Sequence, residues 1–395
     1  MMISVTDAKK IIEENIFTAS PVKLPLDEAY RLILAEDLFA GVDVPSFPQS
    51  SMDGYAFSYG GWEKGMRLRL SGEMAAGSNS VQKILPGEAL RIFTGAAVPE
   101  GADTVLMQEK STCENGELIV TDYKLKAGDN VRLQGAEIKK GSLALSKESL
   151  LTPAAIGYLS GIGIGEVLVY PKPVISIIVT GNELQTPGQP LQYGQVYEAN
   201  SFSLSAALQQ YGIEKPKKYY CGDNLEMLTG ILDEALSQSD LVLLTGGVSV
   251  GDYDFTLKAA ALCGIEKLFH KIKQRPGKPI FFGKKGHKLV FGLPGNPASV
   301  LTCFYIYVIP VIEKYMGKKA LMKVEGAVSG STVKKPSDIT WFLKGFYEAG
   351  IAKILDAQES YRLSSFARAN CLIQLEEDQT ICNPGDRVDI HLLPV

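Results

Sequence analysis

The sequence predicts a multidomain protein in which an α/β unit is combined with separate β-rich regions. Its 395 residues suggest two to four domains at roughly 150 residues per domain. Between residues 174 and 317, strand, turn and helix patterns alternate, which is typical of a mainly parallel sheet. Short alternating runs cut by Gly and Pro turns fill residues 44–138, where they predict an antiparallel β region, and short strands return after about residue 320.

The first 45 residues show two helical patterns. The opening one has its apolar residues on one face: Ala8, Ile11, Ile12 and Ile16. Ser4, with Asp7 three residues on, predicts the cap of this helix. The second pattern, Leu26 to Leu34, predicts another helix, and so does the apolar spacing of Leu151 to Ser160.

Strands and helices of the α/β unit are predicted from composition. The strands are the runs VISIIVT (174–180), KKYY (217–220), LVLLT (241–245) and KLVFGL (288–293). The segments between them are long enough for helices at 202–211, 225–236 and 255–262. Near the end of the chain, WFLKGF, IAKIL, CLIQLEE and RVDIHLLPV predict a small β barrel or a β sandwich.

Composition excludes several functional classes. The 40 Lys+Arg against 44 Asp+Glu lack the basic surplus that non-specific nucleic-acid binding requires. Six cysteines without a CxxC pair and three scattered histidines argue against a zinc site or a thiol redox pair. The N-terminus does not resemble a signal peptide, and the longest apolar stretch, Val300 to Ile312, is too short to span a bilayer and contains Pro310. We therefore expect a cytoplasmic protein that binds no membrane.

Glycine-rich turns follow three predicted strands, where α/β sheets place their ligand crevice. These turns are residues 180–183, 246–251 and 293–299. Glycines let backbone N–H groups approach an anion closely, and a helix that starts beyond the turn adds a favourable dipole. Tight turns also need glycine for purely structural reasons. Three such turns in one unit favour an anionic ligand.

Asp252 and Asp254 are two residues apart, so both side chains point the same way if the backbone is extended. Two carboxylates about 5 Å apart repel by roughly 3 kcal/mol at an effective dielectric near 20. A divalent cation bound together with substrate phosphates would remove that cost. The alternative is a solvated acidic helix start.

The segment KIKQRPGKP, residues 271–279, is basic. Its Pro and Gly residues fix the backbone, so the cations lie on a rigid turn beside the crevice. This arrangement favours phosphate or oxyanion binding. A plain surface charge run is the alternative.

Two segments of the β region, PSFPQSSMDGYAF and RIFTGAAVPEGADTVLMQE, combine turn residues with Asp53 and Thr94. An Asp-Gly pair ordinarily forms a hairpin turn. Arg132 and Glu137 in VRLQGAEI also lie beside a turn, so they receive the same structural interpretation as Asp53. From the residues alone, these side chains are assigned structural roles.

Seven segments occur in a specific order across almost the whole chain: SSMDGYA, RIFTGAAVPEGADTVLMQE, TGNEL, TGGVSVGDYD, RPGKP, GLPGNPAS and SSFARAN. In this order they resemble the molybdopterin molybdotransferases, the MoeA-type molybdenum insertases that are also similar to the gephyrin E domain. The resemblance implies four domains and an elongated homodimer. Residues 1–44 with 139–173 would form an elongated domain I of helices and strands, 45–138 an inserted β-rich domain II, 174–318 a three-layer α/β molybdopterin-binding domain III, and 319–395 a C-terminal β-barrel domain IV.

The family's reaction converts adenylylated molybdopterin and molybdate into molybdenum cofactor, AMP and water with a divalent cation, here expected to be Mg²⁺. The dithiolene sulfurs that bind molybdenum belong to the substrate, so the protein needs no thiolates. The resemblance also implies two kinds of protein partner, a molybdopterin adenylyltransferase and the recipient molybdoenzymes. With few histidines, a carboxylate or a molybdate oxygen would act as general base.

Site residues follow from the same resemblance. Glu183, Asp223 and Asp254 would surround the phosphates and bind the metal. Asp53 and Thr94 would complete the catalytic set from the β region of the other protomer. Substrate would be bound by Gly246, Gly247, Ser249, Lys271, Arg275, Lys278, Pro294, Gly295, Asn296, Pro297, Ser364 and Ser365.

The chain departs from the family pattern at Ser51, Ala136, Glu137, Glu198, Ala199, Asn224 and Glu359. Glu137 and Glu198 keep the negative charge on a longer arm. None of these changes removes a member of the catalytic set. Two other functions fit parts of the pattern: a molybdopterin adenylyltransferase, whose single domain resembles residues 174–317, and a non-catalytic scaffold like gephyrin. The intact acidic set favours catalysis over a scaffold.

Overall fold

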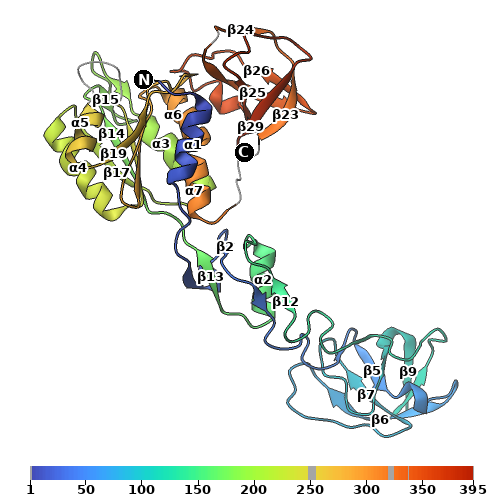
Figure 1. Cartoon of the computed structure of the whole chain (residues 1–395). Coiled ribbons are helices and arrows are strands. Elements are labelled where there is room, and N and C mark those ends of the chain that lie inside the picture. Colours follow the sequence, from blue (N-terminus) through green and yellow to red (C-terminus); the bar gives the residue numbers. More distant parts are fainter. Residues whose placement is uncertain (1, 248–254, 319–323, 337, 395) are drawn as a thin grey trace. The chain divides into compact units, whose positions relative to one another are not determined.

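The computed structural model describes residues 2–247, 255–318, 324–336 and 338–394 (Figure 1). The chain forms two compact units. One comprises residues 1–22, 31–33 and 169–395, and the other comprises residues 23–30 and 34–168.

The first unit contains a six-stranded sheet in the order β17-β14-β18-β22-β21-β19. Its strands are β14 (Ile175–Thr180), β17 (Lys217–Cys221), β18 (Leu241–Thr245), β19 (Glu266–His270), β21 (Phe281–Lys285) and β22 (Lys288–Leu293). The first four strands in this order are parallel, and β21 and β19 add an antiparallel edge. Every residue of β14 and β18 is buried, as expected for strands covered on both faces. The four predicted strands are confirmed.

Helices lie on both faces of this sheet. Figure 1 shows α4 (Leu225–Gln238) and α5 (Phe255–Leu262) on one face, and α3 (Asn200–Gln210) on the other. The predicted helices therefore exist, with boundaries shifted by one or two residues. The N-terminal helix α1 (Val5–Asn15) is also confirmed, because Ser4 Oγ accepts a hydrogen bond from the Asp7 amide at 3.0 Å.

A 19-residue helical run, Pro297–Tyr315, consists of α6 (Pro297–Cys303), a π-helical turn, η4 (Phe304–Val308), and α7 (Ile309–Tyr315). The expectation concerned only the apolar run Val300 to Ile312, and the helix that contains it is longer, because it continues past both ends of the run and through Pro310. By length and composition it could cross a membrane, yet 78% of its apolar window is buried inside the protein. Such burial is typical of the core helix of a globular protein.

The C-terminal region of the first unit is a closed five-stranded barrel. Its strands are β23 (Val324–Ser329), β25 (Thr340–Glu348), β26 (Ile351–Ile354), β27 (Cys371–Leu375) and β29 (Arg387–Leu392). The pairing of β25 with β27 closes the ring. The predicted barrel is confirmed. A short strand of the α/β region, β20 (Gln274–Arg275), pairs in parallel with β25 and so joins the two regions.

The second unit is built around a curled six-stranded sheet in the order β8-β5-β7-β6-β10-β9. Its strands are β5 (Gly54–Phe57), β6 (Arg67–Met74), β7 (Glu88–Ile92), β8 (Thr104–Met107), β9 (Ser111–Glu114) and β10 (Glu117–Val120). The region was expected to be antiparallel, but β6 and β7 are parallel. The unit also contains α2 (Pro153–Gly161), which confirms the helix expected there.

Short elements complete the described chain. They are β1 (Val22–Pro25), β2 (Ile33–Leu34), β3 (Leu38–Phe39), β4 (Gln49–Ser50), β11 (Val131–Arg132), β12 (Leu143–Leu145), β13 (Glu166–Tyr170), β15 (Leu184–Gln185), β16 (Val196–Tyr197), β24 (Val333–Lys334), β28 (Ile381–Cys382), and the 3-10 turns η1 (Leu26–Glu28), η2 (Tyr59–Gly61), η3 (Gln108–Lys110) and η5 (Phe366–Arg368).

The helix predicted over Leu26 to Leu34 does not form. A single 3-10 turn, η1, is followed by the extended strand β2. Arg31 has a left-handed backbone with φ of 64°, which interrupts a right-handed helix. The backbone amides of Leu26 and Leu34 bond to the carbonyls of Gly165 and Ser149, at 2.9 and 3.0 Å. Pairing with distant segments therefore overrides the helical spacing.

Gly317 ends the long core helix, and its replacement tests how tightly this end is packed. Its φ is +67°, its amide bonds to the Lys314 carbonyl, and the Lys318 amide bonds to the Glu313 carbonyl, as in a Schellman motif. A Cβ here would lie 2.2 Å from Cδ2 of Tyr170. We predict that Gly317→Ala lowers the free energy of unfolding, measured by chemical denaturation, by about 1–3 kcal/mol more than a matched control.

The control is Gly286→Ala, in the turn between β21 and β22. Gly286 has a similar φ of +62°, but no atom lies within 4 Å of the added Cβ. This variant therefore measures the cost of the left-handed backbone alone. Equal losses in the two variants would contradict the packing argument.

Candidate functional site

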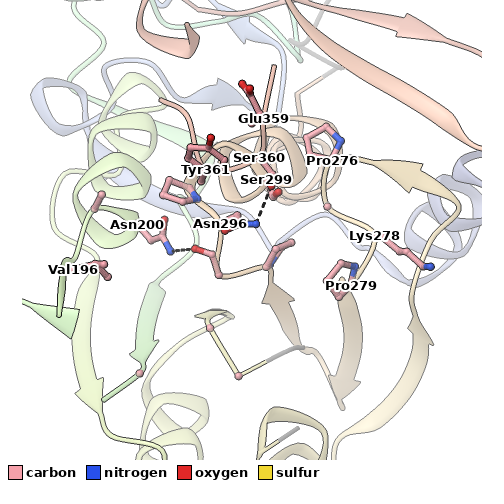
Figure 2. Close-up of a pocket in the computed structure, with 18 of the residues that line it drawn as sticks. Val196, Asn200, Pro276, Lys278, Pro279, Asn296, Ser299, Glu359, Ser360 and Tyr361 are labelled. Atoms are coloured by element: carbon pink, nitrogen blue, oxygen red, sulfur yellow. Dashed lines mark hydrogen bonds between the residues drawn. The ribbon is translucent and has the colours of Figure 1, made fainter. Parts of the chain in front are cut away.

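A cavity of about 1170 Å³ opens at the carboxyl ends of the parallel strands. Its walls come from the loops that follow β14, β17, β18 and β22, from residues 196–200 and 274–279, and from residues 358–361 of the barrel region (Figure 2). All of these segments belong to the first unit. The predicted crevice beyond the strand ends therefore exists as one continuous space.

Glycine is required where β18 ends. Gly246 has φ of +88°, and a Cβ there would lie 2.3 Å from the Thr180 carbonyl oxygen. At Gly247, with φ of +62°, a Cβ would lie 3.0 Å from Thr256 Oγ1. A side chain is thus excluded at Gly246 and strained at Gly247, and the backbone itself borders the cavity. A ligand can approach such a backbone closely.

Two acidic residues, Glu183 and Asp223, line the cavity from neighbouring loops. Asn182 links these loops, because its Oδ1 accepts from the Asp223 amide at 3.1 Å and its amide donates to Asp223 Oδ2 at 3.4 Å. Both carboxylates are exposed. The two residues follow different strands, β14 and β17, and the structure brings both to the cavity, as the family resemblance implies.

Glu183 and Asp223 could supply only some of the ligands of a metal ion. Among the described residues, no group of three or more His, Cys, Asp or Glu side chains is arranged to hold an ion. Asp254, predicted as the third metal ligand, and Ser249 lie outside the described residues. Mg²⁺ ordinarily takes one or two carboxylates and completes its shell with waters and substrate phosphates. Glu183 and Asp223 could supply these one or two carboxylates.

The basic turn is held in place by the side chain of Gln274 and by packing on the core helix. Gln274 Nε2 donates to the Pro276 carbonyl at 2.9 Å and to the Gly277 carbonyl at 3.3 Å. The hydroxyl of Tyr307 donates to Gln274 Oε1. Gly277 has φ of +86°, and a Cβ there would lie 2.4 Å from Cys303 Sγ. Only glycine therefore allows this turn to pack on the core helix.

Of the predicted cations, Arg275 and Lys278 line the cavity and Lys271 does not. The Arg275 guanidinium lies 4.5 Å from the centre of the Trp341 ring, which orients it by a cation–π contact. Lys271 precedes the turn, where its amide donates to the Ile280 carbonyl at 3.0 Å. Its backbone belongs to the base of the turn, and its side chain is not part of the cavity wall.

The loop after β22 brings Pro294, Gly295, Asn296 and Pro297 to the cavity. Asn296 Nδ2 donates to Ser360 Oγ at 2.8 Å (Figure 2). The Ala298 amide donates to the Ser360 carbonyl at 3.0 Å. Ser360 was not among the predicted binding residues. The only sequence signal for it was the neighbouring departure at Glu359, because a lone serine in a loop has no distinctive pattern.

Neither serine of the predicted C-terminal pair lines the cavity. Ser364 is exposed. Ser365 is fully buried, and its hydroxyl donates to the Ala357 carbonyl at 2.8 Å. Ser365 thus contacts the segment that carries Ser360, and a direct substrate contact by this pair stays a prediction.

Glu198 and Asn200 also line the cavity and were missed as site residues. Glu198 is 5% exposed, and its two oxygens accept from the Ser201 amide at 2.8 Å and the Ser201 hydroxyl at 2.6 Å. Asn200 Nδ2 donates to the Gly295 carbonyl at 2.9 Å (Figure 2). The segment VYEAN gave the only signal, since Glu198 and Ala199 are departures from the family pattern.

Asp53 and Thr94 lie together in the second unit. Asp53 Oδ1 accepts from the Thr94 amide and from the Thr94 hydroxyl, both at 2.7 Å. The backbone hydrogen bond first, and then the hydroxyl hydrogen bond, hold the pKa of Asp53 below its ordinary value. Asp53 is therefore not a simple turn residue. Gly54 begins β5, where a Cβ would lie 1.8 Å from the Leu106 carbonyl oxygen.

The other departures have local roles. Asn224 caps α4, because its Oδ1 accepts from the Met227 amide at 2.9 Å. Glu137 is exposed in the second unit, where its amide bonds to the Val44 carbonyl at 2.9 Å. The cavity as a whole combines carboxylates, fixed cations and close backbone, and this combination suits a phosphate or oxyanion ligand held with a divalent cation.

Comparison with known families covers nearly the whole chain. The MoeA N-terminal region (domain I and II) matches residues 3–163. A probable molybdopterin binding domain matches residues 176–314, and the MoeA C-terminal region (domain IV) matches residues 327–393.

Individual relatives are similar over their full length. A molybdopterin molybdenumtransferase from Haemophilus influenzae is 36% identical over 405 residues, which cover 99% of this chain and 100% of that protein. One from Staphylococcus epidermidis is 34% identical over 400 residues, covering 99% and 95%. Two crystal structures of a molybdopterin biosynthesis MoeA protein from Pyrococcus horikoshii, each 28% identical, match all of both chains with TM-scores of 0.81 and 0.76.

The hydroxyl of Thr94 can be tested for its effect on Asp53. We predict that Thr94→Val raises the pKa of Asp53 part of the way to its ordinary value of 3.8, because the amide hydrogen bond remains. A carboxyl whose pKa is depressed in the folded state stabilises the protein above its unfolded pKa. The stability advantage of the wild type over Thr94→Val should therefore vanish as the pH falls through the lowered pKa.

Carbon-detected NMR titration of aspartate carboxyls measures this shift. Asp122 is the internal control, because its pKa is lowered by Lys110 and Lys124 and not by Thr94. An Asp53 pKa that is the same in both proteins would show that the hydroxyl hydrogen bond has no electrostatic effect.

Proposed function

We propose that this chain, which belongs to the MoeA family, is a molybdopterin molybdotransferase: it inserts molybdenum from molybdate into adenylylated molybdopterin and releases AMP and the molybdenum cofactor. The observation that carries the proposal is the cavity that joins the exposed carboxylates of Glu183 and Asp223 to a rigid basic turn. A substrate with a pyrophosphate-type bond and an oxyanion co-substrate needs both kinds of group.

Arg275 and Lys278 would bind the phosphates and the molybdate. Both line the cavity, and the turn that carries them is fixed by Gln274 and Gly277. Cations held in place lose little conformational entropy on binding, and they stabilise the charge that develops as the phosphate bond breaks. The backbone at Gly246 and Gly247 would lie against the phosphates, and residues 294–297 would shape the molybdate and pterin end.

Glu183 and Asp223, with Asp254, would hold Mg²⁺. When bound, the ion polarises the phosphate and neutralises charge on the leaving AMP. The carboxylates themselves are candidates for the general base, because the chain has three histidines and none lines the cavity among the described residues.

Asp53 and Thr94 would complete the site of a partner subunit, as the family resemblance implies, so the working enzyme would be a homodimer. The two hydrogen bonds from Thr94 lower the pKa of Asp53 and hold its carboxylate in one position, and a fixed charge suits the positioning of a cation or a donor group. We further propose the four domain boundaries given above, a cytoplasmic location, and transfer of intermediates from an adenylyltransferase to recipient molybdoenzymes.

Removal of a cavity carboxylate should abolish catalysis without unfolding the protein. We predict that Glu183→Gln and Asp223→Asn each lower molybdate-dependent release of AMP at least 100-fold, an order of magnitude typical for loss of a charged catalytic group. Release of AMP from adenylylated molybdopterin, followed by chromatography with and without molybdate, measures the effect.

Asp233→Asn is the matched control. Asp233 is an exposed carboxylate on α4, paired with Lys285 at 3.4 Å, and it does not line the cavity. Near-normal turnover by Glu183→Gln and Asp223→Asn would exclude the metal-site assignment. If the wild type instead converts ATP and metal-free molybdopterin to the adenylylated product, it is an adenylyltransferase.

Mixing two inactive variants tests whether the site is shared. Asp53→Asn and Glu183→Gln are each expected to be inactive, but in a mixed dimer one site would receive both native residues. Co-refolding equal amounts should therefore restore roughly a quarter of wild-type activity, since about half of the dimers are mixed and each has one intact site. No recovery, or a monomer by light scattering at micromolar concentration, would contradict the shared site.

A further inference from the structure

Lys344 is a buried cation without an assigned role. It lies in the middle of β25 and is 3% exposed. No ion pair within 4.0 Å involves its ammonium among the described residues. Burial lowers its pKa, and the charge of Glu359 partly offsets this effect. A buried ammonium is costly unless its donors are satisfied, so its hydrogen bonds indicate what it is for.

The ammonium has three donors, and each takes one backbone carbonyl. Nζ donates to the carbonyls of Ala357 at 2.6 Å, Glu359 at 3.3 Å and Arg362 at 3.0 Å. These three acceptors span one loop of the barrel region, residues 357–362. Hydrogen bonds from a charged donor are stronger than those between neutral groups. Lys344 Nζ therefore holds three carbonyls of this loop in fixed positions.

The backbone of Lys344 holds the same loop. Its amide donates to Gln358 Oε1 at 3.0 Å, and its carbonyl accepts from Gln358 Nε2 at 2.8 Å. The Ser365 hydroxyl adds a further hydrogen bond to the Ala357 carbonyl. The loop is therefore fixed by the barrel on its inner side.

The outer side of this loop forms part of the cavity wall. Gln358, Glu359, Ser360 and Tyr361 all line the cavity, and Ser360 bonds to Asn296 across it (Figure 2). We propose that Lys344 is a positioning residue that holds loop 357–362 in the geometry that binds the adenylylated substrate. This proposal rests on the proposed function. Lys344 would act through the loop, without touching substrate.

The test replaces Lys344 in the full-length protein with Met, which keeps the apolar stem and removes the three donors. We expect the KM for adenylylated molybdopterin and the Kd for AMP, measured by calorimetry, to rise about tenfold, the factor that corresponds to roughly 1.4 kcal/mol. Because the catalytic carboxylates lie on other loops, kcat should change less than KM. Amide exchange within residues 357–362 should become faster.

Lys335→Met is the matched control. Lys335 lies in the same region, is 6% exposed, and also donates to three carbonyls: Pro336 at 3.3 Å, Ile339 at 2.9 Å and Glu377 at 3.1 Å. Of these only Ile339 lines the cavity. Lys335→Met should therefore lose stability but keep KM, Kd and the exchange of residues 357–362 within about twofold of the wild type, since a twofold change is well under 1 kcal/mol.

Unchanged KM, Kd and exchange in folded Lys344→Met would overturn the proposal, and so would equal changes in Lys335→Met. If Lys344→Met does not fold, Ser365→Ala removes only one hydrogen bond to the same loop. It should raise KM and speed exchange in the same direction by a smaller factor, and no change would again refute the idea. If the wild type neither binds AMP nor releases it, the proposed function fails, and amide exchange alone then decides the role of Lys344.

Discussion

The cavity depends on one backbone pairing, the parallel match of β20 with β25. Gln274 and Arg275 lie in register with Thr340 and Trp341, so the basic turn of the α/β region is built onto a strand of the barrel. The same strand carries Lys344 three residues beyond Trp341, and Lys344 holds the loop of Ser360. Two walls of the cavity are thus fixed to one strand. Because a strand in a closed barrel cannot shift its register alone, their spacing is determined by the barrel.

The C-terminal barrel therefore helps to fix the cavity walls, a role that its sequence pattern does not predict. Barrel strands are recognised from alternating apolar residues, and these report only the core. Lys344 breaks the alternation within β25, and Lys335, which follows β24, is a second buried charge; each is satisfied by backbone carbonyls. Such groups cost free energy in a protein interior unless they organise something in return. Here both organise irregular segments: Lys344 holds the loop that contributes residues 358–361 to the cavity wall, whereas of the residues held by Lys335 only Ile339 borders the cavity.

The sequence predicted regular elements well and the site in part. Strands with every residue buried, such as β14 and β18, have an unambiguous composition, and the Ser4 cap identifies α1. The pattern at Leu26 to Leu34 failed because pairing with distant carbonyls is not visible in local spacing. The glycine-rich turns located the cavity correctly, because few residue types other than glycine adopt the positive φ found at Gly246 and Gly247. Ser360 could not be found, because its position comes from a contact with Asn296 that is 64 residues away in the sequence.

Burial of most of the cysteines makes their thiols poor nucleophiles and poor metal ligands. All six are free, and burial raises the pKa of Cys221, Cys263, Cys303 and Cys371. A protonated thiol is a poor nucleophile and a poor metal ligand. Cys303 lies beneath the basic turn, where its sulfur accepts from Gln274 Nε2 at 3.6 Å and leaves room only for glycine at position 277. Cys303 is fully buried and does not line the cavity, so its thiol has no access to a bound substrate, which is consistent with a site that supplies no thiolate of its own.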